Sequence, residues 1–410
     1  TSLVRAVLAD VQFEPDQTTR RLAEMATILS APMPNSASGP GESGVRRMPM
    51  ERGLFERLDI VFAGLREVTP LRFEEDITAA ALRGVLGDPA DLGMALLCSY
   101  LQERAGRLAV ARATRDLALL LAPGWEPQGR ITNLGDLNPA RSAAWSPSAV
   151  EHPLCRGPLR KVLRALAPAL AEVPQTAGAP VEGETLGPKA EAIFQEVRSM
   201  LDAPAVRALV RGSGADVRFA ATQPLTVLMG QRAEDLDSTE LRFFIARVLE
   251  QARAGTMAVA KLSMNDLRGL LRGVIRVVSM GASDEPPGER DSESDLAAGW
   301  ASRLSQPPIS RLLPSGKARA DLLVDAGEAL ARPPDLEGYV RGCRFTADRV
   351  GLLASGRPLV ALRALTGFYK QEAGVTPPAS EQQERIRSSA ALREIIGFML
   401  SDEYIAMVEE

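Results

Sequence analysis

The sequence predicts a mainly α-helical protein with one small β-sheet, an α+β fold. About 45% of its 410 residues are apolar but only 4% are aromatic, so leucine, alanine and valine must fill the core. Leucine and alanine are strong helix formers. Apolar residues recur at helical spacing along most of the chain, and only three short runs between residues 206 and 229 have the composition of strands.

The N-terminal region, residues 1–121, is predicted to be helical. Helices are expected over residues 1–31, 50–67 and 77–86, and a helical pair over 88–123. Residues 32–50 are rich in proline, serine and glycine, which is typical of a loop. In the helical pair, small residues and a proline have the spacing found in a tetratricopeptide repeat; they are Gly106, Ala111, Ala118 and Pro123. The pair resembles that repeat, but its large early aromatic residues are absent, so a plain helical hairpin is an equal alternative.

An irregular linker, and the main domain boundary, is predicted over residues 122–158. It contains Trp125 and Trp145, which we expect to hold it against a neighbouring surface. Beyond it, periodicity predicts helices over 159–173, 188–201, 262–278, 296–304, 319–330 and 385–408, and strands over 206–210, 217–221 and 225–229. The acidic stretch 281–295 is expected to be a loop. Residues 371–410 form a C-terminal helical extension that begins with a polar linker.

A further helix is predicted over residues 240–255, which read ELRFFIARVLEQARAG, with Asp237 or Ser238 as its N-cap. It resembles the active-site helix of the HtpX and CAAX-prenyl-protease type of zinc metallopeptidase, roughly E-L-x-x-x-x-A-H-E-x-x-H-x-x-x-G. The frame matches at Glu240, Leu241, Ala246 and Gly255. In that frame, Arg247, Val248 and Gln251 replace the first histidine, the catalytic glutamate and the second histidine.

A second segment carries the same resemblance. Residues 345–353 read FTADRVGLL and are similar to the A-D-R-x-G-L-L segment of the family, in which the third zinc ligand is a glutamate four residues before the aspartate. That position holds Arg344. Asp348 and Arg349 are retained, and we expect them to form a structural salt bridge or cap. The resemblance implies a pseudo-metallopeptidase domain over residues 159–370; the alternative is an unrelated helical domain whose amphipathic helix matches the pattern.

The residues that remain cannot perform zinc chemistry. Such a site needs two imidazoles one helical turn apart and a glutamate that activates water. Arginine stays protonated and offers no lone pair to a metal, and His152 is the only histidine of the chain. We therefore expect no catalytic residue, no metal and no cofactor. Arg247, Gln251 and Arg344 could bind an anion in the vestigial pocket, but we favour a filled pocket in which the arginines pair with acidic residues.

The composition also limits the class of partner. The net charge of −4 and a pI near 5.5 give no reason to expect nucleic-acid binding. No apolar run reaches the ~18–20 residues that cross a bilayer, and no signal peptide is expected. The three cysteines, Cys98, Cys155 and Cys343, have no C-x-x-C spacing and are interpreted as small core residues. These features predict a cytoplasmic protein.

The function predicted from these observations is that of a non-catalytic scaffold or regulatory adaptor, which binds protein partners and can belong to a larger complex. High contents of alanine, arginine and glycine suggest a GC-rich bacterial genome. Two alternatives remain at this point. One is a structural subunit of a larger bacterial assembly. The other is an enzyme of another class that uses carboxylates in the repurposed pocket.

Overall fold

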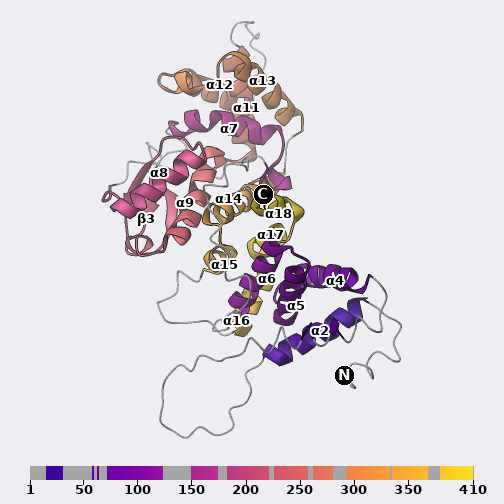
Figure 1. Ribbon diagram of the computed structural model, residues 1–410. Coiled ribbons are helices and arrows are strands. Elements are labelled where there is room, and N and C mark those ends of the chain that lie inside the picture. The colour runs from indigo at the N-terminus through magenta and orange to yellow at the C-terminus, as the bar shows by residue number, and fades with distance from the viewer. Residues whose placement is uncertain are drawn as a thin grey trace. The chain divides into compact units, whose positions relative to one another are not determined.

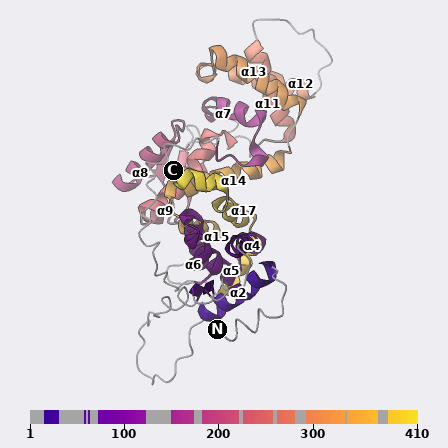
Figure 2. The same ribbon diagram turned by 45° about the vertical axis from the view of Figure 1, so that its right-hand side comes forward.

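The computed structural model describes residues 15–30, 58–59, 62–63, 72–122, 149–173, 182–220, 226–256, 262–279, 292–332, 335–367 and 379–409. The predicted fold class is confirmed, since these residues form mainly helices and one three-stranded sheet (Figures 1 and 2). The chain divides into two compact units. Unit 1 combines Thr1–Asn138 with Arg357–Glu410, and unit 2 is Pro139–Gly356.

Unit 1 is built around a helix that is buried on all sides. Its helices are α2 (Pro15–Ser30), α4 (Phe73–Gly87), α5 (Leu92–Arg104), α6 (Leu108–Leu121), α15 (Pro358–Thr366), α16 (Ala379–Ser388), α17 (Ala390–Met399) and α18 (Asp402–Glu409). Helix α5 packs against α2, α4 and α6 and is buried from Gly93 to Gln102. A Cβ atom on Gly93 would lie 2.2 Å from the carbonyl oxygen of Ala23, so only glycine lets α2 approach this closely.

The C-terminal helices belong to the core of unit 1, whereas the sequence analysis treated residues 371–410 as an extension. Helices α15, α16, α17 and α18 all pack against α6. The backbone N–H of Leu359 at the start of α15 donates to the Asp116 carboxylate on α6, at 3.0 Å. Helices α5 and α6 form the predicted pair, and Gly106 between them has a φ of +76°, which suits glycine.

Unit 2 contains the sheet and the remaining helices. They are η3 (Pro153–Cys155), α7 (Pro158–Ala171), α8 (Pro188–Met200), β1 (Arg207–Val210), β2 (Val217–Ala220), β3 (Thr226–Met229), η4 (Gln231–Ala233), α9 (Ser238–Arg253), α11 (Met264–Ser279), α12 (Ser292–Ser305), η5 (Ile309–Leu312), α13 (Gly316–Ala331) and α14 (Leu336–Ser355). The strand order is β1-β3-β2, with β1 parallel and β2 antiparallel to β3. All three strands lie within the predicted runs.

Helix α9 connects two layers of unit 2. It packs against α8, β2, α7 and α14 (Figure 1). Helices α7, α11, α12 and α13 also contribute to an apolar core that contains Trp300. Its start is fixed by a capping box: the Asp237 carboxylate accepts from the N–H of Glu240, and the Glu240 carboxylate accepts from the N–H of Asp237. Asp237, not Ser238, is therefore the N-cap.

Several sequence predictions fall outside the described residues. They are the predictions for residues 1–14, 32–50, Pro123, Trp125 and Trp145, and for most of 50–67, 281–295 and the polar linker 371–384. Among the helices that the structure describes, none combines the length and apolar character needed to span a membrane.

Candidate functional site

The residues of the predicted vestigial site lie on two helices that pack closely together. Arg247, Val248 and Gln251 are on α9, and Arg344, Asp348 and Arg349 are on α14. The helices touch at a glycine, because a Cβ atom on Gly351 would lie 2.9 Å from the ring of Phe243. The fold thus brings the two sequence segments into one helix–helix interface.

An ion pair joins the two segments at this interface. The Nε of Arg247 lies 2.5 Å from Oδ1 of Asp348; the aspartate side chain is 2% exposed and the arginine side chain 34% exposed. Burial raises the pKa of Asp348, and the positive charges of Arg247 and Arg344 oppose that rise. Arg247 thus compensates a carboxylate that is otherwise withdrawn from water.

The other predicted site residues have different surroundings. Val248 is buried, Gln251 is partly buried and Arg344 is exposed. Arg349 is buried and donates to the carbonyl oxygen of Val150 at 3.4 Å. Asp348 thus pairs with an arginine of α9, and Arg349 binds a backbone carbonyl of the segment before α7.

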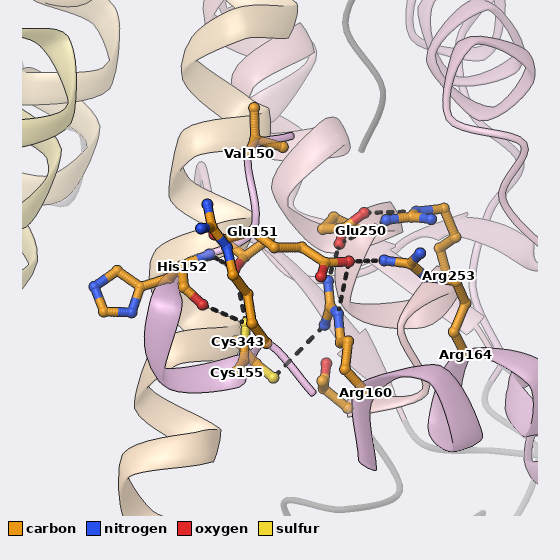
Figure 3. A network of polar contacts seen from close by, with 12 residues as sticks. Val150, Glu151, His152, Cys155, Arg160, Arg164, Glu250, Arg253 and Cys343 are labelled. Carbon is orange, nitrogen blue, oxygen red and sulfur yellow. Dashed lines mark hydrogen bonds and ion pairs between the residues drawn. The ribbon is translucent and has the colours of Figure 1, made fainter. Parts of the chain in front are cut away.

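A larger polar network, which the sequence did not predict, lies next to this interface (Figure 3). Arg160 of α7 donates to Glu250 of α9 at 2.5 Å, and their side chains are 2% and 1% exposed. Arg253 binds the same carboxylate through two nitrogens, at 2.7 and 3.0 Å. On the other side, Arg160 lies 3.4 Å from the Glu151 carboxylate, which also accepts from Arg164. Three guanidinium groups thus share two carboxylates inside the unit.

The charges of the network shift the pKa values of its own members. Burial alone would lower the pKa of Arg160, but the Glu250 carboxylate and other acidic neighbours raise it above the ordinary value. The pKa of Arg164 is lowered by burial and by the charge of Arg253, against the opposing effect of Glu250. Arg160 is therefore held in its charged form, and its contact with Glu250 links α7 to α9.

Arg160 also extends the network to two cysteines. Its Nη1 lies 3.6 Å from the sulfur of Cys343 on α14. Cys155, at the end of η3, donates to the carbonyl oxygen of His152 at 3.2 Å and lies 3.2 Å from the Thr346 hydroxyl. The His152 ring packs edge-on against Phe345 and its Nδ1 accepts from the N–H of Leu154. Segments far apart in the chain therefore meet around one arginine.

The sequence carried one signal for this network. Arg160 has the helical spacing of the buried residues Leu163 and Ala167, three and seven residues on, and Glu250 lies among the apolar residues of α9. A charge on an apolar face predicts a buried ion pair but does not identify its partner.

In the described ranges, no group of three or more histidine, cysteine, aspartate or glutamate side chains could hold a metal ion.

No family model matches the chain, and neither a curated protein nor a solved structure matches it significantly.

Proposed function

We propose that this chain is a non-catalytic scaffold or adaptor that binds a protein partner in the bacterial cytoplasm, and that the α9–α14 pair of unit 2 descends from a zinc-peptidase site. The Arg247–Asp348 ion pair carries the proposal. In the resemblance, Arg247 stands at the position of the first zinc-binding histidine. Its side chain pairs with the Asp348 carboxylate of α14 instead of binding a metal.

The chemistry of the replacing residues supports this proposal. Guanidinium groups have no free lone pair for a cation, and Arg247 and Arg344 both act electrostatically on Asp348. A divalent ion at this position would be repelled by two positive charges. The arginines instead stabilise a buried carboxylate, which is a structural role, and the filled-pocket interpretation is favoured over anion binding.

The peptidase-like frame is tested by restoring the ligands. The variant Arg247→His/Gln251→His/Arg344→Glu places two imidazoles one turn apart on α9 and a carboxylate on α14. We expect one Co²⁺ or Zn²⁺ per folded chain, with an affinity at least about 100-fold above that of the wild type, measured by cobalt absorption spectra and metal mass spectrometry.

The matched control keeps both histidines but carries Arg344→Gln, so it lacks the third ligand. Its affinity for the metal should be at least about 10-fold lower than that of the triple variant. A triple variant that keeps the wild-type circular dichroism spectrum and binds no more metal than the wild type contradicts the frame. Should the triple variant fail to fold, the control variant alone should still bind Co²⁺ more tightly than the wild type.

The adaptor role is tested separately, by cross-linking the full chain in its native cells and identifying linked peptides. We expect a reproducible protein partner in a stable complex that survives purification, and a Gln251→Ala variant should retain it. Turnover of peptide substrates by the metal-free wild type, lost on Gln251→Ala, would instead assign an enzymatic function to the pocket.

A further inference from the structure

The two cysteines beside Arg160 differ from the third cysteine because both lie where η3 packs against α14. Cys155 and Cys343 are 1% and 3% exposed, and each thiol is the largest influence on the pKa of the other. Figure 3 shows both beside the polar network, with Arg160 reaching the sulfur of Cys343. Cys98 lies in α5 of unit 1, where its thiol is buried and burial raises its pKa to about 12.

The backbones that carry the two thiols approach closely. A Cβ atom on Gly342, the residue before Cys343, would lie 2.9 Å from the backbone nitrogen of Cys155. The Thr346 hydroxyl, one turn further along α14, lies 3.2 Å from the sulfur of Cys155. A disulfide requires Cα atoms within about 4.4–6.8 Å of each other, and this close contact of η3 with α14 favours such a separation.

Polar groups also favour one thiolate in the pair. The Cys343 thiol, the Thr346 hydroxyl and the charge of Arg160 lower the pKa of Cys155, against the opposing effect of burial. The pKa of Cys343 is raised, because it shares its proton with Cys155 and is buried. The thiolate is the form that reacts with oxidants, so Cys155 is the nucleophile and Cys343 the second thiol.

We propose that Cys155 and Cys343 form an oxidation site, at which hydrogen peroxide converts the two thiols into an intramolecular disulfide that links η3 to α14. The Cys155 thiolate attacks one peroxide oxygen; the O–O bond breaks, hydroxide leaves and a sulfenic acid forms. The Cys343 thiol then attacks that sulfur, the S–S bond forms, and the S–O bond breaks as water leaves. Two thiols and one peroxide give one disulfide and two waters.

Burial selects the oxidant. Both sulfur atoms are almost inaccessible in the folded unit, so a small uncharged peroxide molecule reaches them more readily than a disulfide of glutathione, whose attack needs a direct approach of two sulfur atoms. The disulfide also replaces the contact between Cys343 and Arg160. Oxidation therefore changes the network that joins α7, α9 and α14.

The experiment treats the full-length native chain with hydrogen peroxide or, in parallel, with glutathione disulfide, and then blocks free thiols before non-reducing peptide mass spectrometry. We expect a cross-linked peptide pair containing Cys155 and Cys343 with peroxide, formed at least about 10-fold faster than with glutathione disulfide. The Cys343→Ser variant should accumulate a sulfenic acid on Cys155 that dimedone traps, whereas Cys155→Ser should leave Cys343 about 10-fold less reactive.

The Cys98→Ser variant is the matched control and should form the same disulfide at the wild-type rate. The proposal is overturned if peroxide yields no Cys155–Cys343 link in the folded wild type, or if the link forms only after urea unfolds the chain. A Cys343→Ser protein with no dimedone adduct on Cys155, although circular dichroism shows it folded, would also overturn it. The wild-type and Cys98→Ser measurements keep the test decisive if a serine variant of the pair does not fold.

Discussion

Helix α9 takes part in two charged contacts that differ in their surroundings. At Glu250, both the carboxylate and its partner Arg160 are withdrawn from water, and arginines from two helices share the charge. At Arg247, three residues earlier, a single arginine that is one-third exposed reaches the buried Asp348. In the first contact neither Arg160 nor Glu250 can reach solvent, whereas in the second the Arg247 side chain can. The loss of one partner should therefore lower the free energy of unfolding by very different amounts at the two positions.

The largest expected effect is at Glu250. The substitution Glu250→Gln removes the charge that compensates Arg160 and Arg253, and an unpaired buried charge costs about 3–5 kcal/mol. Urea unfolding followed by circular dichroism measures the loss, and hydrogen exchange of peptides from α7, α9 and α14 locates it in unit 2. The double variant Arg160→Met/Glu250→Leu should recover more than half of the lost stability, because an apolar pair of similar volume replaces the charges. Equal losses in the single and double variants would show that packing, not charge, holds this contact.

The contact at Arg247 should be asymmetric. Arg247→Met leaves the Asp348 carboxylate buried without its cation, and we expect the free energy of unfolding to fall by about 2–3 kcal/mol. Asp348→Asn should lower it by only about 1 kcal/mol, because Arg247 can then turn to solvent. Urea midpoints of the two variants and of their double variant measure this difference.

The stability of the Arg247→Met variant should also depend on pH. Burial raises the pKa of Asp348, and removal of Arg247 raises it further. The folded chain then retains a proton that the unfolded chain releases, so stability is lost as pH rises through the folded pKa. The deficit of Arg247→Met relative to the wild type should therefore be larger at about pH 8 than at about pH 5. A deficit that is constant with pH would contradict an uncompensated carboxylate.

The smallest expected effect is at His152. Its pKa is lowered from 6.5 to about 4, first by burial and then by the charges of Arg349, Arg156 and Arg341. Because the folded pKa is depressed, the unfolded chain binds the proton first, and the contribution of His152 to stability is lost as pH falls from about 6.5 to about 4. His152→Asn keeps a side-chain acceptor for η3 without this titration. Over this range the wild type should lose measurably more stability than the variant, but by no more than about 1 kcal/mol, since solvent screens a half-exposed ring. Identical acid unfolding curves of the two proteins would contradict this prediction.

The sequence was sufficient to predict what depends on local periodicity. The three strands, and helices such as α8 and α9, follow from apolar spacing and from the capping residue Asp237, because these signals act within a few residues. The partners of Arg160 could not be predicted in this way. Glu250 and Cys343 lie far along the chain from it, and Glu151 belongs to a stretch that composition alone describes as a linker.

The site residues show the same limit. The sequence identified Arg247 and Asp348 as members of one site through a resemblance, and the structure brings them together. It did not indicate that Arg349 binds the carbonyl of Val150. Such choices depend on which backbone group is left without a helical partner in the folded state, and periodicity does not contain that information.

Unit 1 is formed by two stretches of the chain that are separated by the whole of unit 2, and this affects how it folds during synthesis. Helix α6 leaves the ribosome well before α15 to α18, the helices that pack against it, and all of unit 2 is translated in between. Until the last helices emerge, the apolar side chains of α6 that they cover remain in contact with water or with whatever else binds them. Unit 2 can complete its own core during that interval. Nascent chains of this protein should therefore depend on chaperones that shield an unfinished N-terminal half, and a circular permutant that joins the two parts of unit 1 should escape that dependence.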